Sequence, residues 1–561
     1  MCAAIACGAK ENDRPRGVRA SADASGIEVS WQAVSGARAY RVQLADLDTR
    51  EQRGDPVVVR ATSAHLEGAF SRSLGVWVDA LLPDRTARGV GFVSAGASGG
   101  TGASWQMFGP QDFRTGAVRA SFQQLAPGEH LGVLLVNSGG RDPAIAQVDA
   151  TGVAAAPAPS EPPAGHTGLR MAEQRAPALH APQEEIVETA APSERLVLAD
   201  HTSFCVVPAM DFSRHVRKPA TRLLSTAHAD FFADDDDAAH YDAALMARLG
   251  SALEERVLPS SNAAFGPPTD VDGNGKLLVL LTHELGAHLN GGWLIGYFGN
   301  GDLLRGRDES RDCSGTGSNH AEIIYLNDVA NGAANGYSVE DLAAVTYPAT
   351  IAHELQHLIN LGRRCVERAC DGPEATWINE ALSKVAEDLA GYGWNAPRGR
   401  AEGALYLSRP AYEGRSLTKW EGDPIGNYQG AHSFLRFFAD RLGDRLPGEI
   451  NRDAGGVPAL EDALGRPLPR AMAEWASALL LSNEAGAAYN FSGAAWLPLH
   501  QRLRHLDYRR PGEQVSMRTD GIAAFVSGAG QGGAAEVTVR SGEDVPPHVV
   551  VVRIQGDLPR D

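Results

Sequence analysis

Long apolar runs are absent from this sequence of 561 residues, and basic residues are fewer than acidic ones. No stretch approaches the roughly 20 apolar residues that a membrane-spanning helix requires, so we expect no transmembrane segment. The 51 lysines and arginines against 69 aspartates and glutamates give a formal net charge of −18, which argues against a nucleic-acid partner. Hydrophobic residues make up 43% of the chain, which is enough for several packed domains and excludes disorder of the whole chain.

A cysteine near the N-terminus stands in a pattern typical of exported bacterial proteins. The letters AIACG around Cys7 resemble the end of a lipoprotein signal, in which the cysteine becomes the lipidated first residue. The apolar segment of such a signal is not found in the six residues before Cys7. We interpret residues 1–14 as a signal remnant. We expect a secreted or cell-surface protein of bacterial type, with a lipid anchor at Cys7 as one hypothesis.

Cysteine is scarce, with six in the whole chain. Four remain when the two at the N-terminus are set aside. In an exported protein these four would allow a long-range disulfide between Cys205 and Cys313 and a small loop closed by Cys365 and Cys370.

The first part of the chain has the pattern of β-structure. Alternating apolar residues predict a β-sandwich over residues 15–105. Within it, the stretch IEVSWQAVSGARAYRVQL resembles a fibronectin type III domain, with Trp31 in an early strand and Tyr40 at the start of the next. A second β segment follows over residues 106–152. Seven prolines mark residues 153–193 as an extended linker.

The second part of the chain mixes helix and strand patterns. Strand-like and helix-like segments alternate after residue 194, and the pattern is mainly helical beyond about residue 338. We therefore expect an α+β domain over residues 194–490 with a mainly helical C-terminal part. Strand patterns return over residues 491–561 and predict a small terminal β domain. The expected fold class is multidomain: a β-sandwich, an α+β domain and a small β tail.

The stretch YPATIAHELQHLINLGRR contains an H-E-x-x-H motif, formed by His353, Glu354 and His357. Apolar residues on one face predict that this stretch is a buried helix. On a helix the two histidines lie one turn apart on the same face and can bind one metal ion. Glu354 is adjacent and can take a proton from a water at the open position of the metal. The motif therefore predicts a hydrolytic Zn²⁺ site with Glu354 as the general base.

A third ligand is expected from a carboxylate further along the chain. Twenty-three residues after His357, Glu380 lies in the helix-like stretch TWINEALSKVAEDLAGYG. A His₂Glu set leaves the fourth zinc position to water, as catalytic sites require. A helix is a rigid base for a ligand, which favours Glu380. Glu374, Glu387 and Asp388 are the alternatives nearby in the sequence.

H-E-x-x-H followed by N-E-x-x-S resembles the gluzincin metallopeptidases and, more specifically, the hyicolysin family of bacterial zinc peptidases. The resemblance covers about residues 195–490 and includes the stretches FGPPTDVDGNGKLLVLL, GGWLIGYFGNGDL, SNHAEIIYLND and NYQGAHSFLRFFADRLG. It implies a zincin fold and a protein or peptide substrate. It also implies that His353, His357 and Glu380 bind zinc and that Glu354 is the general base.

One position departs from the gluzincin pattern. Thermolysin-like members have a carboxylate four residues after the glutamate ligand, which steadies a ligand histidine, and this chain has Lys384 there. Glu387, on the same helical face as Glu380, is the expected replacement. The oxygen that develops charge during hydrolysis also needs a hydrogen-bond donor. Tyr428 is preferred over His432 because related zincins often use a downstream tyrosine, and a purely packing role for Tyr428 is the equal alternative.

Three other polar patterns are interpreted as structural. DVDGNG, which begins at Asp270, copies the start of an EF-hand loop, but its twelfth position is Leu281 rather than an acidic residue. A tight turn is favoured there, and Ca²⁺ at a site of another type is the alternative. HELGAH places His283 and His288 five residues apart, about 140° on a helix, which predicts a loop. The acidic run at residues 234–237 predicts a solvated loop.

Two functions follow from these patterns. The first is a zinc-dependent endopeptidase that hydrolyses peptide bonds of extracellular proteins. The second is a non-catalytic cell-surface adhesion or scaffold protein with a degenerate peptidase domain. Loss of Glu354 or of a ligand would favour the second function, and all four residues are present.

Overall fold

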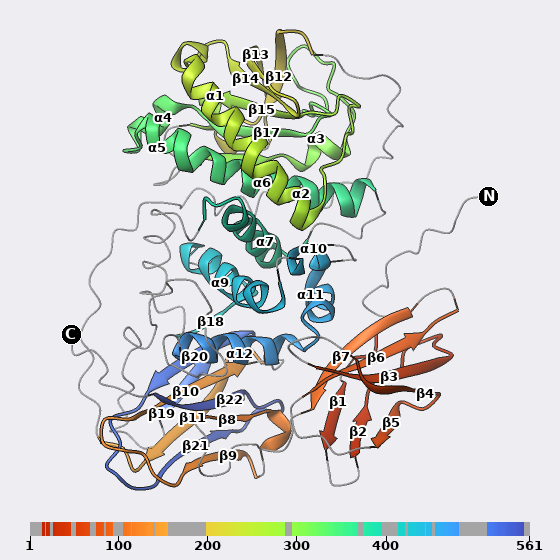
Figure 1. Cartoon of the computed structure of the whole chain (residues 1–561), viewed down its shortest axis with the longest axis vertical. Coiled ribbons are helices and arrows are strands. Elements are labelled where there is room, and N and C mark those ends of the chain that lie inside the picture. Colours follow the sequence, from red (N-terminus) through yellow and green to blue (C-terminus); the bar gives the residue numbers. More distant parts are fainter. Residues whose placement is uncertain are drawn as a thin grey trace. The chain divides into compact units, whose positions relative to one another are not determined.

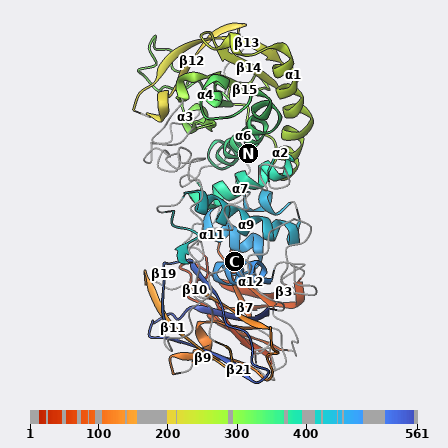
Figure 2. The same ribbon diagram turned by 90° about the vertical axis from the view of Figure 1, so that its left-hand side faces the viewer.

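The computed structural model describes most of the chain, and Figures 1 and 2 show it from two directions. The described residues are 14–16, 18–22, 26–46, 52–67, 74–83, 86–93, 105–113, 115–137, 141–154, 198–211, 213–286, 294–367, 374–393, 413–420, 424–443, 445–451, 455–481 and 513–554. Cys7 and almost all of the proline-rich stretch lie outside them, so the lipid anchor and the linker stay predictions. None of the described helices is long and apolar enough to cross a membrane.

The described residues form two compact units. The first, called the sandwich unit, contains those within 1–164, 404–446 and 456–561. The second, called the site unit, contains those within 165–403 and 447–455. The sequence predicts one α+β domain over residues 194–490, whereas the structure assigns its later helices to the sandwich unit.

The N-terminal part of the sandwich unit is a β-sandwich, as the alternating pattern predicts. One antiparallel sheet has the order β1 (Arg19–Ala22), β2 (Gly26–Ser30), β5 (Ser63–Glu67). The other has the order β4 (Gln52–Val59), β3 (Ala39–Asp46), β6 (Leu74–Leu81), β7 (Thr86–Val93). Their inner faces share one apolar core, in which the ring of Trp31 meets that of Tyr40 edge-on at 5.2 Å.

A second β-sandwich is built from both ends of the chain. One sheet has the order β18 (Glu413–Ser416), β20 (Gly521–Val526), β10 (His130–Asn137), β22 (His548–Ile554), β8 (Trp105–Phe108). The other has the order β19 (Glu513–Met517), β11 (Ala144–Thr151), β21 (Ala535–Ser541), β9 (Ala117–Phe122). The sequence treats residues 106–152 and 491–561 as separate pieces, but their strands pair and share one core.

Strand β10 shows why these two segments belong together. All eight of its residues are buried, and Val133 lies opposite Phe525 on one side and Val551 on the other. A strand with neighbours on both edges and both faces covered has no polar face to alternate with, which explains its continuous apolar run. Single-sequence patterns cannot show which distant strand completes such a sheet.

We expect truncations to separate the two sandwiches. Deleting residues 1–154 removes β8–β11 and exposes the edges of β20 and β22, so the remaining chain should aggregate. Deleting residues 1–93 removes only the N-terminal sandwich and should leave a soluble chain. Size-exclusion chromatography of both truncated chains is the measurement. A soluble, monomeric product of the longer deletion would contradict the shared sandwich.

The described part of the sandwich unit includes the helices α9 (Pro424–Leu442), α11 (Gly456–Leu464) and α12 (Leu468–Leu481). Helix α12 packs on β10 and β22, and α9 and α11 pack on α12. The apolar face of α12 is thereby covered by the second sandwich. Because α12 packs on β10 and β22, these helices belong to the sandwich unit. Helical periodicity shows that a face is buried but does not show which partner buries it.

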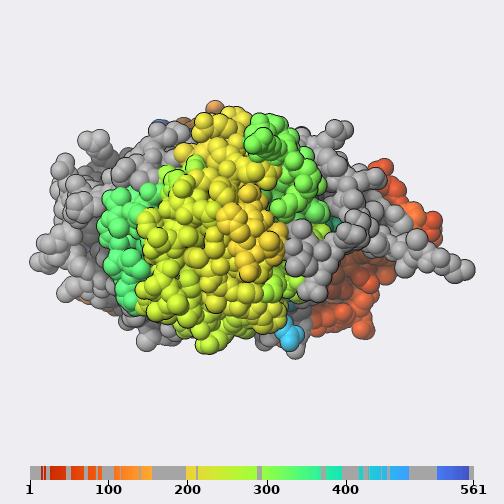
Figure 3. All heavy atoms as spheres, turned by 90° about the horizontal axis from the view of Figure 1, so that it is seen from above, coloured from red at the N-terminus to blue at the C-terminus, as the bar shows by residue number. Residues whose placement is uncertain are grey.

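The site unit is built on a mixed six-stranded sheet. Its order is β12 (His201–Val206), β13 (Val216–Ser225), β14 (Ala229–Asp234), β15 (Leu277–Thr282), β17 (Ile323–Asn327), β16 (Gly296–Phe298). Strands β14, β15 and β17 are parallel, and the others pair antiparallel. All six residues of β15 are buried, as expected for a central parallel strand. Figure 3 shows yellow to yellow-green atoms, the colours of the β12, β13 and α1 segments, exposed on one face.

Helices complete the site unit, and α1 and α6 pack directly on its sheet. The helices are α1 (Ala243–Ala252), α2 (Leu258–Phe265), α3 (Asn300–Leu304), α4 (Val329–Ala334), α5 (Val339–Asp341), α6 (Tyr347–Leu361), α7 (Thr376–Leu389) and α10 (Leu446–Ile450), which begins at the boundary between the units. Helix α1 packs against β13 and runs alongside the sheet in Figure 2. Helix α6 packs on β16, β17, α2 and α7, so it is a central helix, as its apolar stripe predicts.

The cysteines follow the sequence prediction as far as they are described. A disulfide joins Cys205 and Cys313, as predicted, and Cys365 is also in a disulfide, with Cys370 outside the described residues.

The acidic run at residues 234–237 is not a fully solvated loop: Asp235 and Asp236 are exposed, but Asp234 and Asp237 are buried. The prediction is wrong for these two because Asp234 is still part of β14 and Asp237 begins the turn that follows it.

Candidate metal centre

Helix α6 carries the H-E-x-x-H motif in a fixed orientation. Pro348 lies in its first turn, directly after the π-helical stretch Leu342–Thr346, where the regular α-helical hydrogen bonds are already interrupted and a missing N–H is tolerated. Leu355, Leu358 and neighbouring apolar residues are fully buried, so the helix cannot rotate about its axis without exposing them. His353 and His357 therefore share one face, and their rings lie edge-on with centroids 4.9 Å apart.

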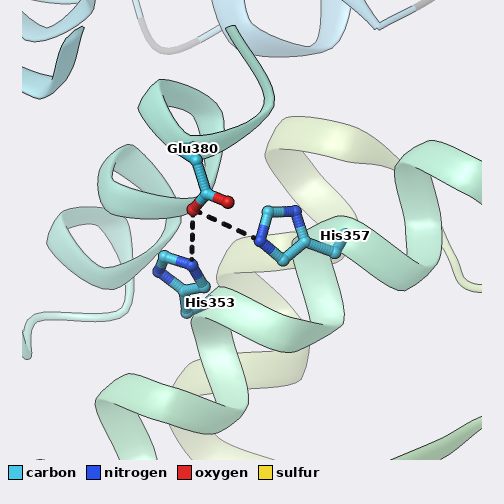
Figure 4. Close-up of side chains that lie close together, drawn as sticks. All are labelled: His353, His357 and Glu380. Atoms are coloured by element: carbon cyan, nitrogen blue, oxygen red, sulfur yellow. Dashed lines mark hydrogen bonds and ion pairs between the residues drawn. The ribbon is translucent and has the colours of Figure 1, made fainter. Parts of the chain in front are cut away.

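Helix α7 brings Glu380 to these histidines. Trp377 and Leu382 are buried and anchor the helix, and Glu380 is itself only 3% exposed. Its carboxylate oxygen Oε2 lies 3.1 Å from Nε2 of His353 and 3.5 Å from Nε2 of His357 (Figure 4). The structure thus brings together the three residues that the sequence predicts as ligands.

The donor set fits a zinc ion. The three ligand atoms all lie within 4.8 Å of one another. Two ligands that are each 2.0–2.2 Å from a tetrahedral zinc ion are about 3.4 Å apart, which is close to the two measured N···O separations. Two imidazole nitrogens and one carboxylate oxygen also form a combination found in catalytic zinc sites, with the fourth position open.

Glu387 and Lys384 support His353 from the side opposite Glu380. Oε1 of Glu387 lies 2.9 Å from Nδ1 of His353, and its Oε2 accepts a hydrogen bond of 2.5 Å from Nζ of Lys384. All three side chains are at most 10% exposed. Since Nδ1 of His353 is held by Glu387, Nε2 faces Glu380. The lysine that departs from the gluzincin pattern compensates the charge of this buried carboxylate.

Ser383 contacts the other histidine, a role that the sequence analysis did not assign. Its hydroxyl lies 3.1 Å from Nδ1 of His357 and 2.5 Å from Oε1 of Gln356. Ser383 is the last letter of the N-E-x-x-S motif, and its spacing of three from Glu380 places it one helical turn further on. That spacing was the signal available in the sequence.

The side chains of the cluster carry complementary charges. Burial by itself lowers the pKa of His353, but its bonds with Glu380 and Glu387 outweigh burial and raise this pKa to about 10. Burial raises the pKa of Glu380, but the two histidines outweigh it and hold this pKa below its usual range. His353 and Glu380 thus form an ion pair, and His357 faces the same carboxylate oxygen.

The remaining candidates from the sequence lie in different places. Glu354 is partly exposed on α6, next to His353, and its charge also raises the pKa of His353. Glu374 lies near the guanidinium of Arg364, with 3.6 Å between Oε2 and Nη1, and neither Glu374 nor Asp388 is in the cluster. Glu380 is therefore the carboxylate that the structure places against both histidines.

Tyr428 and His432 lie on α9, in the sandwich unit. Both are buried, and the Tyr428 ring lies 4.9 Å from that of Trp420. The role of Tyr428 as a hydrogen-bond donor stays a prediction.

The DVDGNG segment forms a turn, as the sequence analysis favours. Asp270 accepts from the backbone N–H of Gly275, and Asp272 accepts from that of Asn274. Glu322 joins these two aspartates in a carboxylate group, and burial raises the pKa of Asp272 to about 7. Ca²⁺ binding at this group stays the untested alternative.

Among known proteins, the chain is similar to a bacterial metalloprotease. No protein-family model matches the chain. The chain is 26% identical over 260 residues to the neutral metalloprotease ShpI of Staphylococcus hyicus, which covers 44% of this chain and 56% of ShpI. The chain thus spans about half the length of this relative. The similarity supports a relationship to metalloproteases.

Two solved structures match a short part of the chain. FN3tt mut and FN3tt are each 12% identical to it, with TM-scores of 0.13 and 0.12. Each match covers 15% of this chain, with 91% and 94% of the respective structures. TM-scores this low carry no argument about the fold.

Proposed function

We propose that this chain is a zinc-dependent endopeptidase of the gluzincin type, resembling the hyicolysin family, and that its substrates are extracellular proteins or peptides. The observation that carries the proposal is the position of Glu380 Oε2 against Nε2 of both motif histidines. The similarity to a neutral metalloprotease supports the same activity. Under this proposal His353, His357 and Glu380 hold Zn²⁺.

The chemistry divides between the metal and the chain. A bound zinc ion would supply Lewis acidity to the scissile carbonyl and to the attacking water. Glu354 accepts the proton of that water and delivers it to the leaving amine. Glu387, held by Lys384, keeps the His353 ring in place, and Ser383 does the same for His357. Tyr428 remains our candidate from the sequence for stabilising the developing oxyanion.

The proposal also covers the N-terminal domain and the location of the protein. We infer that the N-terminal sandwich is fibronectin type III-like, because its three-stranded and four-stranded sheets pack as in that class of domain. Export to the cell surface or medium fits the disulfide between Cys205 and Cys313. The adhesion or scaffold function is the alternative if the purified chain proves inactive.

The proposal is tested with casein as an unstructured substrate. The purified chain should cleave casein into fragments that mass spectrometry identifies. Incubation with 1,10-phenanthroline followed by desalting should abolish cleavage, and stoichiometric ZnCl₂ should restore it, whereas CaCl₂ should not. Cleavage that persists after the zinc is removed, or no cleavage by the zinc-loaded chain, would contradict the proposal.

Substitution of Glu387 tests how the site is supported. In Glu387→Gln the amide keeps the size of the side chain but loses the charge that holds His353. We expect the affinity for zinc to fall by about 10- to 100-fold, with catalysis retained at saturating zinc. Competition with a fluorescent chelator measures the affinity. The matched control is Glu255→Gln, an exposed glutamate of the same unit, which should bind zinc as the wild type does. Equal affinities in both variants would remove this role from Glu387.

A further inference from the structure

A second group of potential ligands lies at the carboxyl ends of the three parallel strands. Asp237 follows β14, His283 follows β15, and Asp328 follows β17. His240 ends the short turn Ala238–His240 after Asp237. In open α/β sheets this edge is where ligands bind, because the loops after parallel strands converge there.

The distances within this group match those of a metal site. Nδ1 of His240 lies 3.1 Å from both carboxylate oxygens of Asp328. Ligand atoms of Asp237, His240 and Asp328 all lie within 4.8 Å of one another. Nδ1 of His283 lies 2.8 Å from Oδ2 of Asp237, which also accepts the backbone N–H of His283. The group therefore has three convergent ligands, and His283 holds one of them in place.

Two buried carboxylates of this group have only histidines as ion-pair partners among the described residues. Asp237 is 4% exposed and Asp328 is 1% exposed. Ligand atoms of both carboxylates lie within 4.8 Å of each other and of a His240 ring nitrogen, so two buried negative charges are held close together. Among the described residues, no lysine or arginine forms an ion pair with either of them. By contrast, Nζ of Lys218 lies 3.0 Å from Asp234 and compensates that adjacent buried aspartate.

We propose that Asp237, His240 and Asp328 bind a divalent transition-metal ion, in a site separate from the His353 centre. Mixed imidazole and carboxylate ligands suit ions such as Zn²⁺. The His240 side chain is 41% exposed and gives an ion access from solvent. Tyr241 donates a hydrogen bond of 2.8 Å to Asp328 and orients it from behind, as the outer partners of metal ligands do.

This second site has a structural role. The hydroxyl of Tyr347, the first residue of α6, donates to the backbone carbonyl of Asn327, which precedes Asp328. An ion bound by Asp328 and Asp237 joins the ends of β17 and β14 and so fixes the strand end to which α6 is attached. The ion thereby stabilises the start of the helix that carries His353 and His357. The inference does not depend on the proposed peptidase activity.

Zinc stoichiometry of the full chain tests the second site. The purified chain is stripped with a chelator and titrated with ZnCl₂ by calorimetry. The wild type should bind two equivalents, and His353→Ala/His357→Ala should still bind one. Adding His240→Ala to that variant should remove the remaining equivalent and abolish the rise in Tm caused by zinc. Circular dichroism checks that each variant is folded.

A matched substitution distinguishes the site from an ordinary histidine–carboxylate pair. His228 contacts Glu254 at 2.8 Å on the surface, so His228→Ala removes a similar pair without touching the group. In the His353→Ala/His357→Ala background it should leave the remaining equivalent bound. The inference is overturned if His353→Ala/His357→Ala binds no zinc, or if His240→Ala leaves its binding unchanged. If the wild type binds just the one equivalent that His240→Ala removes, the second site stands and the His353 centre fails.

Discussion

Replacing Glu354 by glutamine is expected to remove most peptide-bond hydrolysis while the chain keeps its full zinc content. Glutamine has almost the size of glutamate but cannot take a proton from the attacking water. General acid–base catalysis contributes about 10²- to 10⁴-fold, so kcat/KM should fall within that range. Glu354 is not among the three convergent residues of the His353 centre, so the metal should remain bound. Hydrolysis of a fluorogenic peptide and elemental analysis measure the two effects.

The control for this variant makes the same change at a neighbouring glutamate. Glu367 is exposed and caps the helical stretch that continues from α6. Glu367→Gln should retain wild-type activity and zinc. Wild-type turnover in Glu354→Gln would exclude it as the general base. Loss of zinc in the same variant would instead place Glu354 among the ligands.

Replacing Glu380 by alanine is expected to abolish activity and to remove one zinc equivalent. Its Oε2 is the carboxylate atom that faces Nε2 of both His353 and His357, and alanine offers no donor in its place. The decrease in zinc affinity should be larger than the decrease of about 10- to 100-fold that is expected when a supporting residue such as Glu387 is changed. Calorimetric titration with ZnCl₂ and the casein assay are the measurements.

Glu374 provides the comparison for this second prediction. It is one of the two other buried glutamates that the sequence left as ligand candidates, and it lies near Arg364 rather than His353. Glu374→Gln should therefore keep both zinc and activity, provided that circular dichroism shows it to be folded. If Glu374→Gln loses zinc and Glu380→Ala keeps it, the ligand assignment is wrong. The peptidase proposal then has to be rebuilt on the other carboxylate.

The residues of the His353 centre were predictable because they are encoded locally. Helical spacing places His353 and His357 on one face whatever the rest of the chain does. The burial of Trp377 and Leu382 on α7 was also readable from periodicity. The role of Ser383 was missed because its hydroxyl gains a function only when α7 lies against α6.

The polar residues of the second group could not be predicted in the same way. The acidic run at residues 234–237 reads as a solvated surface, and His283 reads as part of a loop. Asp237 and Asp328 are 91 residues apart and meet because β14, β15 and β17 are parallel neighbours with aligned ends. Strand order depends on pairing between distant segments, which leaves no local pattern.

By itself, the sequence predicted the candidate site: two histidines one helical turn apart, a downstream carboxylate and an adjacent glutamate proposed as the general base. It also determined the β character of both ends of the chain, because alternation and apolar runs are local. Only the tertiary structure decided that the two ends form one sandwich, that α9, α11 and α12 belong to it, and that Glu380 rather than Glu374 faces the histidines. These outcomes depend on which buried surfaces pack together, and the packed segments are up to hundreds of residues apart in the sequence. Periodicity indicates that a face is buried but not which segment covers it.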